Sequence, residues 1–282
     1  MPLSDTAREL LRGAIDMHVH ASPDPYAARR MDARQLALGA RDAGMAGLVL
    51  KSHEYPTGPL AWALGTEIEG IALYGAVALD HAVGGLNVDA VDVALRTGAR
   101  VVWMPTFDAA HWREFRPGGA HSKRDGIRVV DGDGRLVPAV REILDLVADA
   151  GAVLASGHLS PGETLALLRE ARQRGIPSIV THASFWTPVQ VQRELVAMGA
   201  FIEQCAIAVQ GEGGDAVFDA IAEQVRSAGT DHVVLSTDLG QAANPDPPEG
   251  FGLWMDRFLG AGFTEAEVGL MVRGNPRKLL GE

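Results

Sequence analysis

The sequence alternates short apolar runs with longer segments of helical spacing, and this alternation restricts the fold more than any other feature. The apolar runs are rich in Val, Ile and Ala, which is typical of parallel strands covered by helices on both faces. The predicted strands are residues 14–17, 47–50, 72–78, 100–104, 152–156, 178–181, 201–203 and 232–236. Parallel strands need long connections, so this repeat indicates an α/β protein.

The segments between these strands carry the signals of helix ends. Proline stands near helix starts at Pro138 and Pro188, and glycine follows helix ends at Gly98 and Gly151. The predicted helices are residues 32–43, 60–69, 88–97, 138–150, 162–173, 188–198, 215–227 and 249–259. About eight strand–helix units predict one domain, residues 1–282, folded as a (β/α)8 TIM-like barrel. A doubly wound open sheet is the alternative, weakened by the lack of a glycine-rich phosphate loop.

One segment interrupts the alternation after the fourth predicted strand. Residues 107–136 are charged and rich in glycine, and the stretch at 131–134 reads as the turn of a β-hairpin. Asp131 and Asp133 belong to a turn rather than a calcium loop, because no glutamate completes an EF-hand pattern. Loops that follow barrel strands lie at the active-site face, so we expect this insertion to form a lid there.

Four of the predicted strands end in a histidine or an aspartate. His18 and His20 close the first strand, and strand alternation points both side chains the same way. His158, His182 and Asp238 stand at the ends of the fifth, sixth and eighth strands. The carboxyl ends of barrel strands converge on one mouth, where active sites form. Imidazole and carboxylate ligands suit zinc first, with manganese or iron as alternatives, so these residues predict a metal site.

The order of these motifs resembles that of the amidohydrolase superfamily of metal-dependent barrel hydrolases. The shared pattern is His-x-His on the first strand, histidines on the fifth and sixth, and an aspartate on the eighth. The C-terminal stretch at 274–281, GNPRKLLG, is similar to the N-P-A-K-x-L-G ending that is common in these enzymes. The resemblance covers nearly the whole chain, from Asp16 to Gly281.

The resemblance implies a metal-dependent hydrolase that acts on an amide, a lactone or a related carbonyl substrate. It implies that His18 and His20 bind a first ion, and that His158 and His182 bind a second ion or contribute to a single one. It also implies that Asp238 contacts the metal and moves the proton as general base and acid. A bound metal lowers the pKa of water toward about 7, which makes this chemistry feasible at neutral pH.

The fourth strand departs from the family pattern. Two-metal members carry a carboxylated lysine or a glutamate there, whereas residues 100–106 contain neither. Lys51, His53 and Glu203 end other strands and are candidates for additional metal or substrate contacts. Lys51 could be carboxylated and bridge two ions, bind a substrate anion, or be a surface lysine with a packed stem. The sequence is therefore compatible with either one or two metal ions in the site.

Four other residues near strand ends are weaker candidates for substrate binding. Arg30 follows the His-x-His loop and could hold a carboxylate, while Tyr55, Trp103 and Trp186 could line a pocket. The alternative for Arg30 is a solvated surface position. The alternative for the three aromatic side chains is ordinary packing. His232 begins the eighth strand, so we expect it at the opposite end of the barrel and exclude it.

Other functions share part of the pattern. Phosphoesterases of the PHP class also open with His-x-His, and residues 51–54 loosely match their second motif, although residues 238–240 differ from their ending. Metal-dependent decarboxylases related to the amidohydrolases use a similar ligand set. A barrel that binds a metal without catalysis is the remaining alternative.

The amino-acid composition limits which molecules the protein is expected to bind. A net charge of −11 repels phosphate groups, so nucleic acid and membrane surfaces are not expected partners. The single cysteine, Cys205, excludes an intrachain disulfide and reads as a buried structural thiol in a reducing cytoplasm. No apolar stretch approaches the ~20 residues of a membrane span, and no signal peptide is visible. We expect a cytoplasmic enzyme with a small-molecule substrate that could form a homo-oligomer.

Overall fold

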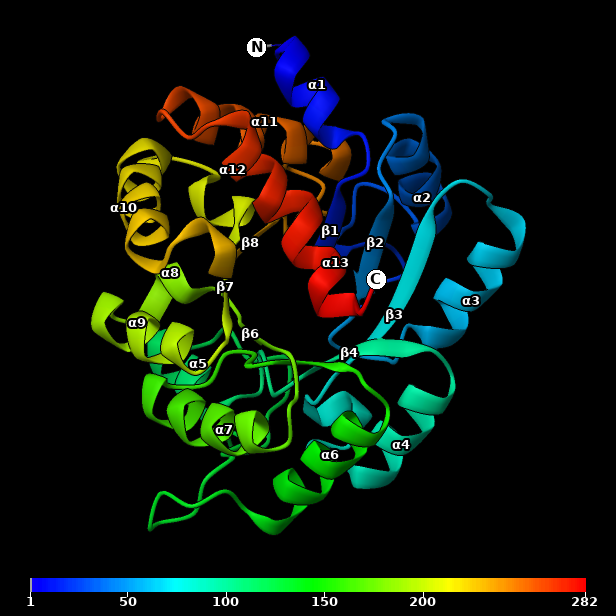
Figure 1. Ribbon diagram of the computed structural model, residues 1–282. Helices are drawn as coiled ribbons and strands as arrows, with labels where there is room; N and C mark the ends of the chain where they lie inside the picture. The colour runs from blue at the N-terminus through cyan, green and yellow to red at the C-terminus, as the bar shows by residue number, and fades with distance from the viewer. Residues whose placement is uncertain (1) are drawn as a thin grey trace. The chain divides into compact units, whose positions relative to one another are not determined.

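A computed structural model describes residues 2–282 and contains eight parallel strands connected by helices. The strands form one sheet in the order β1-β2-β3-β4-β5-β6-β7-β8 (Figure 1). They are β1 Ile15–His20, β2 Gly47–Lys51, β3 Ala72–Ala78, β4 Ala99–Trp103, β5 Val153–Ala155, β6 Ser178–Val180, β7 Phe201–Cys205 and β8 Val233–Ser236. This arrangement confirms the (β/α)8 TIM-like barrel that the alternation predicts.

Helices follow the strands in the order expected for this fold. They are α1 Asp5–Leu11, α2 Ala33–Asp42, α3 Gly58–Glu67, α4 Val88–Arg96, α5 Ala110–Phe115, α6 Pro138–Asp149, α7 Pro161–Gln173, α8 Ala183–Trp186, α9 Val189–Ala197, α10 Gly214–Ala228, α11 Pro247–Gly260, α12 Glu265–Gly269 and α13 Asn275–Leu280. Shorter turns are η1 His81–Val83, η2 Ala206–Val209, η3 Thr230–His232 and η4 Leu270–Gly274, a single π-helical turn. Within residues 2–282, no helix combines the length and apolar character needed to span a membrane.

The strands are buried almost throughout, as their continuous apolar runs predict. Every residue of β1, β2, β7 and β8 is buried. A buried polar group without a partner costs about 1–3 kcal/mol, so the few polar side chains in these strands need dedicated partners. Those partners determine how the strand-end histidines and carboxylates are held.

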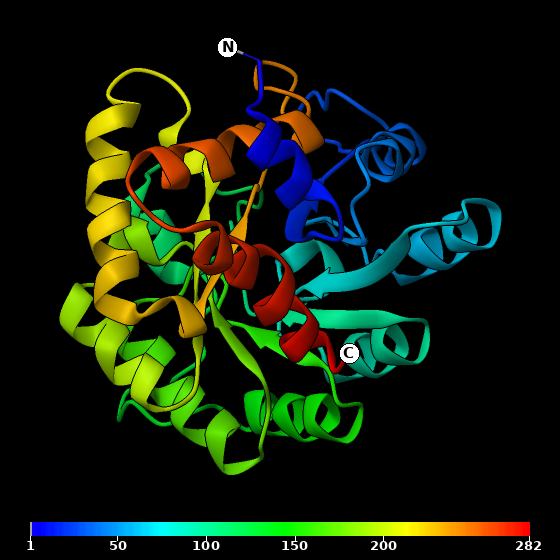
Figure 2. The same cartoon turned by 45° about the horizontal axis from the view of Figure 1, so that its top comes forward.

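The chain is organised in two compact units. The first contains residues 2–50, 60–74 and 203–282, and the second contains residues 51–59 and 75–202. In the first unit, α11 packs against α1 and α2, and the contact of α1 with α11 is visible in Figures 1 and 2. In the second unit, α4 packs against α6 and α7 packs against α9.

The insertion after β4 is partly helical. Helix α5 lies within residues 107–136, where the sequence predicts only a loop and a hairpin. Its six residues are too few to show a helical period in the sequence. The hairpin turn is present, because Val130 and Leu136 pair as an antiparallel bridge and Asp131 accepts hydrogen bonds from backbone groups of the turn.

The C-terminal motif secures the amino end of β8. Asn275 is 2% exposed, and its Nδ2 donates to the carbonyl oxygens of Thr230 and Val233 at 2.8 and 2.6 Å. Thr230 and His232 belong to the turn η3, so β8 begins at Val233, one residue later than predicted. His232 therefore stands at the amino end of the strand, on the side opposite to Asp238.

Replacing Asn275 with alanine removes the donor from two backbone carbonyls that begin β8. We expect the free energy of unfolding to fall by about 1–3 kcal/mol, as is usual when buried polar groups lose a partner. Urea unfolding measures this change, with Gln190→Ala on the exposed face of α9 as the control. Equal unfolding midpoints for the two variants would contradict the assigned role.

Candidate metal centre

Strand β1 presents two histidines on one side at its carboxyl end. His18 and His20 are 0% and 3% exposed, and the ring centroids lie 5.4 Å apart. The period of two residues in a strand gives both side chains the same direction. Both imidazoles therefore lie in a dry environment where they need polar partners.

Asp238, which follows β8, faces both imidazoles. Its Oδ1 lies 3.1 Å from Nε2 of His18 and 2.9 Å from Nε2 of His20. One ligand atom from each of the three residues lies within 4.8 Å of the others, which is a spacing that a metal ion could bridge. Two imidazole nitrogens and a carboxylate oxygen are a donor set that zinc accepts, so these residues fit a metal.

The backbone after β8 is strained in a way that aims this carboxylate. Asp238 has a φ of 52°, and its amide donates to the carbonyl of His18 at 2.7 Å. Non-glycine residues seldom adopt this left-handed conformation, and such strain gathers at functional sites. Gly240, with a φ of 135°, lets the loop pass β1, since a Cβ there would lie 2.1 Å from the carbonyl oxygen of His20.

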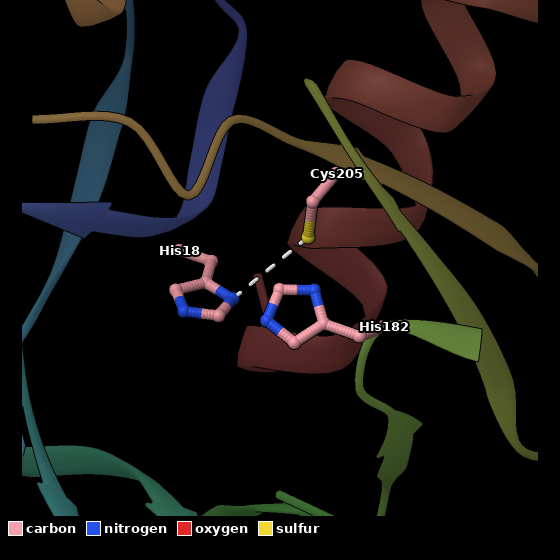
Figure 3. A group of neighbouring side chains, drawn as sticks. All are labelled: His18, His182 and Cys205. Atoms are coloured by element: carbon pink, nitrogen blue, oxygen red, sulfur yellow. Dashed lines mark hydrogen bonds between the residues drawn. The ribbon is translucent and has the colours of Figure 1, made fainter. Parts of the chain in front are cut away.

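The other ring nitrogen of His18 faces strand β7. Nδ1 lies 3.3 Å from Oε2 of Glu203 and 3.9 Å from Sγ of Cys205, and Figure 3 marks the contact with the sulfur. A carboxylate that accepts the Nδ1 proton fixes the tautomer and leaves the Nε2 lone pair for a metal. Glu203 is 0% exposed and lies where such a carboxylate would orient His18, while Cys205 is a buried thiol beside the same nitrogen.

A buried aspartate joins the two strands that carry this group. Oδ1 of Asp16 accepts from the backbone amides of His18 and Thr237 at 3.1 and 3.0 Å, and Oδ2 accepts from the Thr237 hydroxyl. Burial raises the pKa of Asp16 to about 7, although these hydrogen bonds act in the opposite direction. The carboxyl of Asp16 thus holds β1 and β8 in register beside His18 and Asp238.

Two further candidate ligands, His158 and His182, lie together in the second unit. Their ring centroids are 5.3 Å apart, and both residues are buried. His182 has a φ of 51°, so it leaves β6 in a left-handed conformation, as Asp238 does after β8. Gly157 precedes His158 with a φ of 60°, and a Cβ there would lie 2.3 Å from the carbonyl oxygen of Met104.

Aromatic side chains surround His158. The ring centroids of Trp112, Trp186 and Phe107 lie 4.7, 5.3 and 5.5 Å from its own. Phe107 and Trp112 come from the insertion after β4, which therefore contributes side chains beside a candidate ligand. Trp186 comes from α8, close to His182, and is only half-buried.

Lys51 is the last residue of β2 and His53 follows the strand, and both are 3% exposed. Nζ of Lys51 lies 5.1 Å from the ring centroid of Trp103, which is a cation–π contact. Trp103 is itself completely buried, which favours packing over the pocket-lining role considered from the sequence. His53 contacts Thr106, whose hydroxyl oxygen lies 2.6 Å from its Nδ1.

Arg30 and Tyr55 lie at the loops after β1 and β2. Arg30 pairs with Asp246 and donates to the carbonyl of Ala242 at 2.9 Å, which ties the loop after β1 to the loop after β8. These contacts favour a structural role for the arginine over binding of a substrate carboxylate. Tyr55 is half-buried.

Sequence reasoning overlooked the residues that orient the candidate ligands. Asp16 lies in the buried strand β1 and Thr237 directly follows the buried strand β8, and a polar residue beside such apolar runs could have indicated them. Asp80 and Thr106 lie in the turns after β3 and β4, where polar residues are common, so no sequence signal separates them from ordinary turn residues.

The barrel fold of this chain is shared with the solved structures of several hydrolases. The structure is similar to an amidohydrolase from Pseudomonas aeruginosa, with a TM-score of 0.64 and 13% identity over 98% of this chain and 99% of that one. It is similar to a lactonase from Listeria monocytogenes, with a TM-score of 0.60 and 13% identity over 96% and 95%. An organophosphorus hydrolase from Deinococcus radiodurans gives a TM-score of 0.62 and 17% identity over 100% and 97%. The shared fold agrees with the resemblance found in the sequence.

The chain belongs to the family described as "Family of unknown function (DUF6282)", whose model matches residues 13–203. The matched range includes the candidate ligands His18, His20, His158 and His182, whereas Asp238 lies beyond it. A search of curated proteins finds no match.

Two substitutions of Asp16 distinguish its role as a hydrogen-bond acceptor from any contribution of its negative charge. Asp16→Ala leaves the buried amides of His18 and Thr237 without an acceptor, so we expect a loss of about 3 kcal/mol in the free energy of unfolding. Asp16→Asn keeps one acceptor oxygen, and the Thr237 hydroxyl can turn to accept from the new amide, so its loss stays below about 1 kcal/mol. Urea unfolding of metal-free protein measures both, and equal losses would refute this account.

Glu203→Gln tests the orienting role of the carboxylate beside His18. We expect the variant to keep its metal but to bind it about 10–100-fold more weakly, as is usual when the partner of a ligating histidine is removed. Competition with a chelator measures the affinity, with Glu194→Gln on the exposed face of α9 as the control. Unchanged affinity would exclude the role, and complete loss of metal would indicate a direct ligand instead.

Proposed function

We propose that this chain is a metal-dependent hydrolase that acts on an amide, a lactone or a related carbonyl substrate. The observation that carries the proposal is the convergence of the Nε2 atoms of His18 and His20 on Oδ1 of Asp238. The names of the similar structures, an amidohydrolase and a lactonase, support the choice of a carbonyl substrate.

We assign the metal ligands to His18, His20, His158, His182 and Asp238. His158 and His182 follow β5 and β6 of the same parallel sheet, and the carboxyl ends of barrel strands supply active-site residues together. The mixture of imidazole and carboxylate favours zinc, with manganese or iron as alternatives, and one or two ions. Glu203 is placed to orient His18, and a direct contact with a metal or the substrate is the alternative.

The chemistry follows from the positions of the side chains. A divalent ion held by these ligands would supply a water of lowered pKa and polarise the substrate carbonyl. The side chain of Asp238 is 14% exposed, whereas those of His18 and His20 are almost fully buried, so it is the member that water and substrate can reach. We assign it as the group that takes a proton from water and returns it to the leaving group.

Lys51 is assigned to a negatively charged part of the substrate. Lys51 is the last residue of β2 and its Nζ lies over the ring of Trp103, so it stands at the carboxyl end of a strand, where barrel active sites form. A phosphate ester is the second candidate substrate, because a structurally similar protein is an organophosphorus hydrolase.

Elemental analysis tests the ligand assignment. Alanine substitutions of His18, His20, His158 and His182 are each expected to lower the metal content of protein purified without chelator, because each removes a ligand. His232→Gln is the matched control, since His232 stands at the opposite end of β8. Wild-type stoichiometry in the His18 and His20 variants would refute the metal centre.

A substrate panel tests the reaction class. Metal-loaded protein is assayed with δ-valerolactone and p-nitrophenyl acetate as carbonyl substrates, and with paraoxon as the phosphate ester. Asp238→Asn keeps an oxygen for the metal but cannot take a proton, so we expect the rate to fall by about 10²–10⁴-fold. Hydrolysis of paraoxon alone would favour the second candidate, and an unchanged rate in Asp238→Asn would exclude the assigned role.

A further inference from the structure

A cavity of about 850 Å³ lies in the first unit, where the chain before and at the start of α1 meets α11 (Figure 1). Its walls come from residues 2–5, from the turn η2 after β7, and from α11 with the end of the loop before it. Ligand cavities in proteins usually measure about 300–1,000 Å³, so this one is large enough for an organic molecule. None of its lining residues is a candidate metal ligand.

Most of the lining is apolar. The apolar side chains include those of Leu3, Val209, Pro245, Leu253 and Trp254. Val209 and Trp254 are buried, whereas Leu3 and Leu253 are half-buried, so the surface extends from the interior to the solvent. A concave apolar surface of this kind binds the apolar part of a ligand, because that part then leaves water.

Hydrogen bonds hold the walls of the cavity in place. The amide and the hydroxyl of Ser4 both donate to the carboxylate of Asp256, which fixes residues 2–5 against α11. Nε1 of Trp254 donates to the carbonyl oxygen of Gln204 in β7 at 3.4 Å. Walls that are fixed before a ligand arrives reduce the entropic cost of binding.

The charged groups of the lining favour a cation. Two carboxylates, Asp5 and Asp256, line the cavity together with one guanidinium, Arg257. Arg257 pairs with Asp215, which lies outside the lining, at 2.5 Å. The groups that contact Asp256 are the neutral amide and hydroxyl of Ser4. A carboxylate offers about four lone-pair positions, so Asp256 can accept a further hydrogen bond from a ligand.

We propose that this cavity binds an organic cation with an apolar body, an alkyl or arylalkyl ammonium, whose charged head contacts the carboxylate of Asp256. Asp5 is exposed and pairs with Arg8 at 3.5 Å, so recognition of the head falls to Asp256. The ammonium group donates to Asp256 while the apolar body packs on Leu253 and Trp254. This binding site is additional to the proposed metal centre, because no candidate ligand lines it.

Three probes with the same phenylbutyl body test the choice of head group: 4-phenylbutylamine, 4-phenylbutanol and 5-phenylvalerate. Binding is followed by the indole ¹H–¹⁵N resonances of metal-loaded protein labelled at its five tryptophans, where Trp254→Phe identifies the resonance of Trp254. We expect the amine to shift that resonance at about 5-fold lower concentration than the alcohol, which is the gain from one half-buried ion pair. The valerate should bind more weakly than either.

Two substitutions at one contact separate the charge of Asp256 from its structural role. Asp256→Asn removes the negative charge and should abolish the preference for the amine over the alcohol. Ser4→Ala removes a hydrogen bond of the same contact but keeps the carboxylate, so the preference should remain. Equal loss of the preference in both variants would make the position of residues 2–5 the cause and would overturn the assignment to Asp256.

Four other results would overturn the proposal. Equal responses to the amine and the alcohol would show that the cavity does not select a charge. A preference for the valerate would assign recognition to Arg257 and an anion. A Trp254 resonance that responds to no probe would exclude a ligand in this cavity. A resonance that moves with protein concentration alone would make a second copy of the chain the occupant.

Discussion

The candidate site depends on the pairing of the first strand with the last. Hydrogen bonds from Asp238 to His18 and from His20 to Leu239 bring residues more than 200 positions apart into contact. This closure brings the carboxylate of Asp238 within about 3 Å of two imidazoles. Neither strand could present that group alone, because both histidines come from β1 and the carboxylate from the loop after β8.

Buried carboxylates lie beside histidines within each unit. Glu203 faces Nδ1 of His18, and Asp80 faces Nδ1 of His53 through the hydroxyl of Thr106. In each case the carboxylate lies on the Nδ1 side of the imidazole ring. Burial of these carboxyls is costly, and the raised pKa values of Asp16 and Asp80 show that burial disfavours their charged forms. Their hydrogen bonds offset part of that cost.

The backbone around the site departs from ordinary geometry where the ligands leave their strands. His182 and Asp238 are the non-glycine residues with positive φ among residues 2–282, and both are candidate ligands. Gly157 and Gly240 stand next to the site for a related reason, since a side chain there would collide with a neighbouring carbonyl. Such strain persists only where the surrounding structure holds it, so the barrel's hydrogen-bonded strand ends make this arrangement possible.

The sequence by itself determined the barrel and the identity of the candidate ligands, because both follow from local patterns. Apolar runs, prolines and glycines mark the strands and helices, and His18, His20, His158, His182 and Asp238 stand at strand ends. Only the tertiary structure decided which groups face each other: Asp16 with Thr237, Glu203 with His18, and Asp80 with His53 through Thr106. It also decided that α5 forms in the insertion. These contacts join strands and turns far apart in the chain, so no local period encodes them.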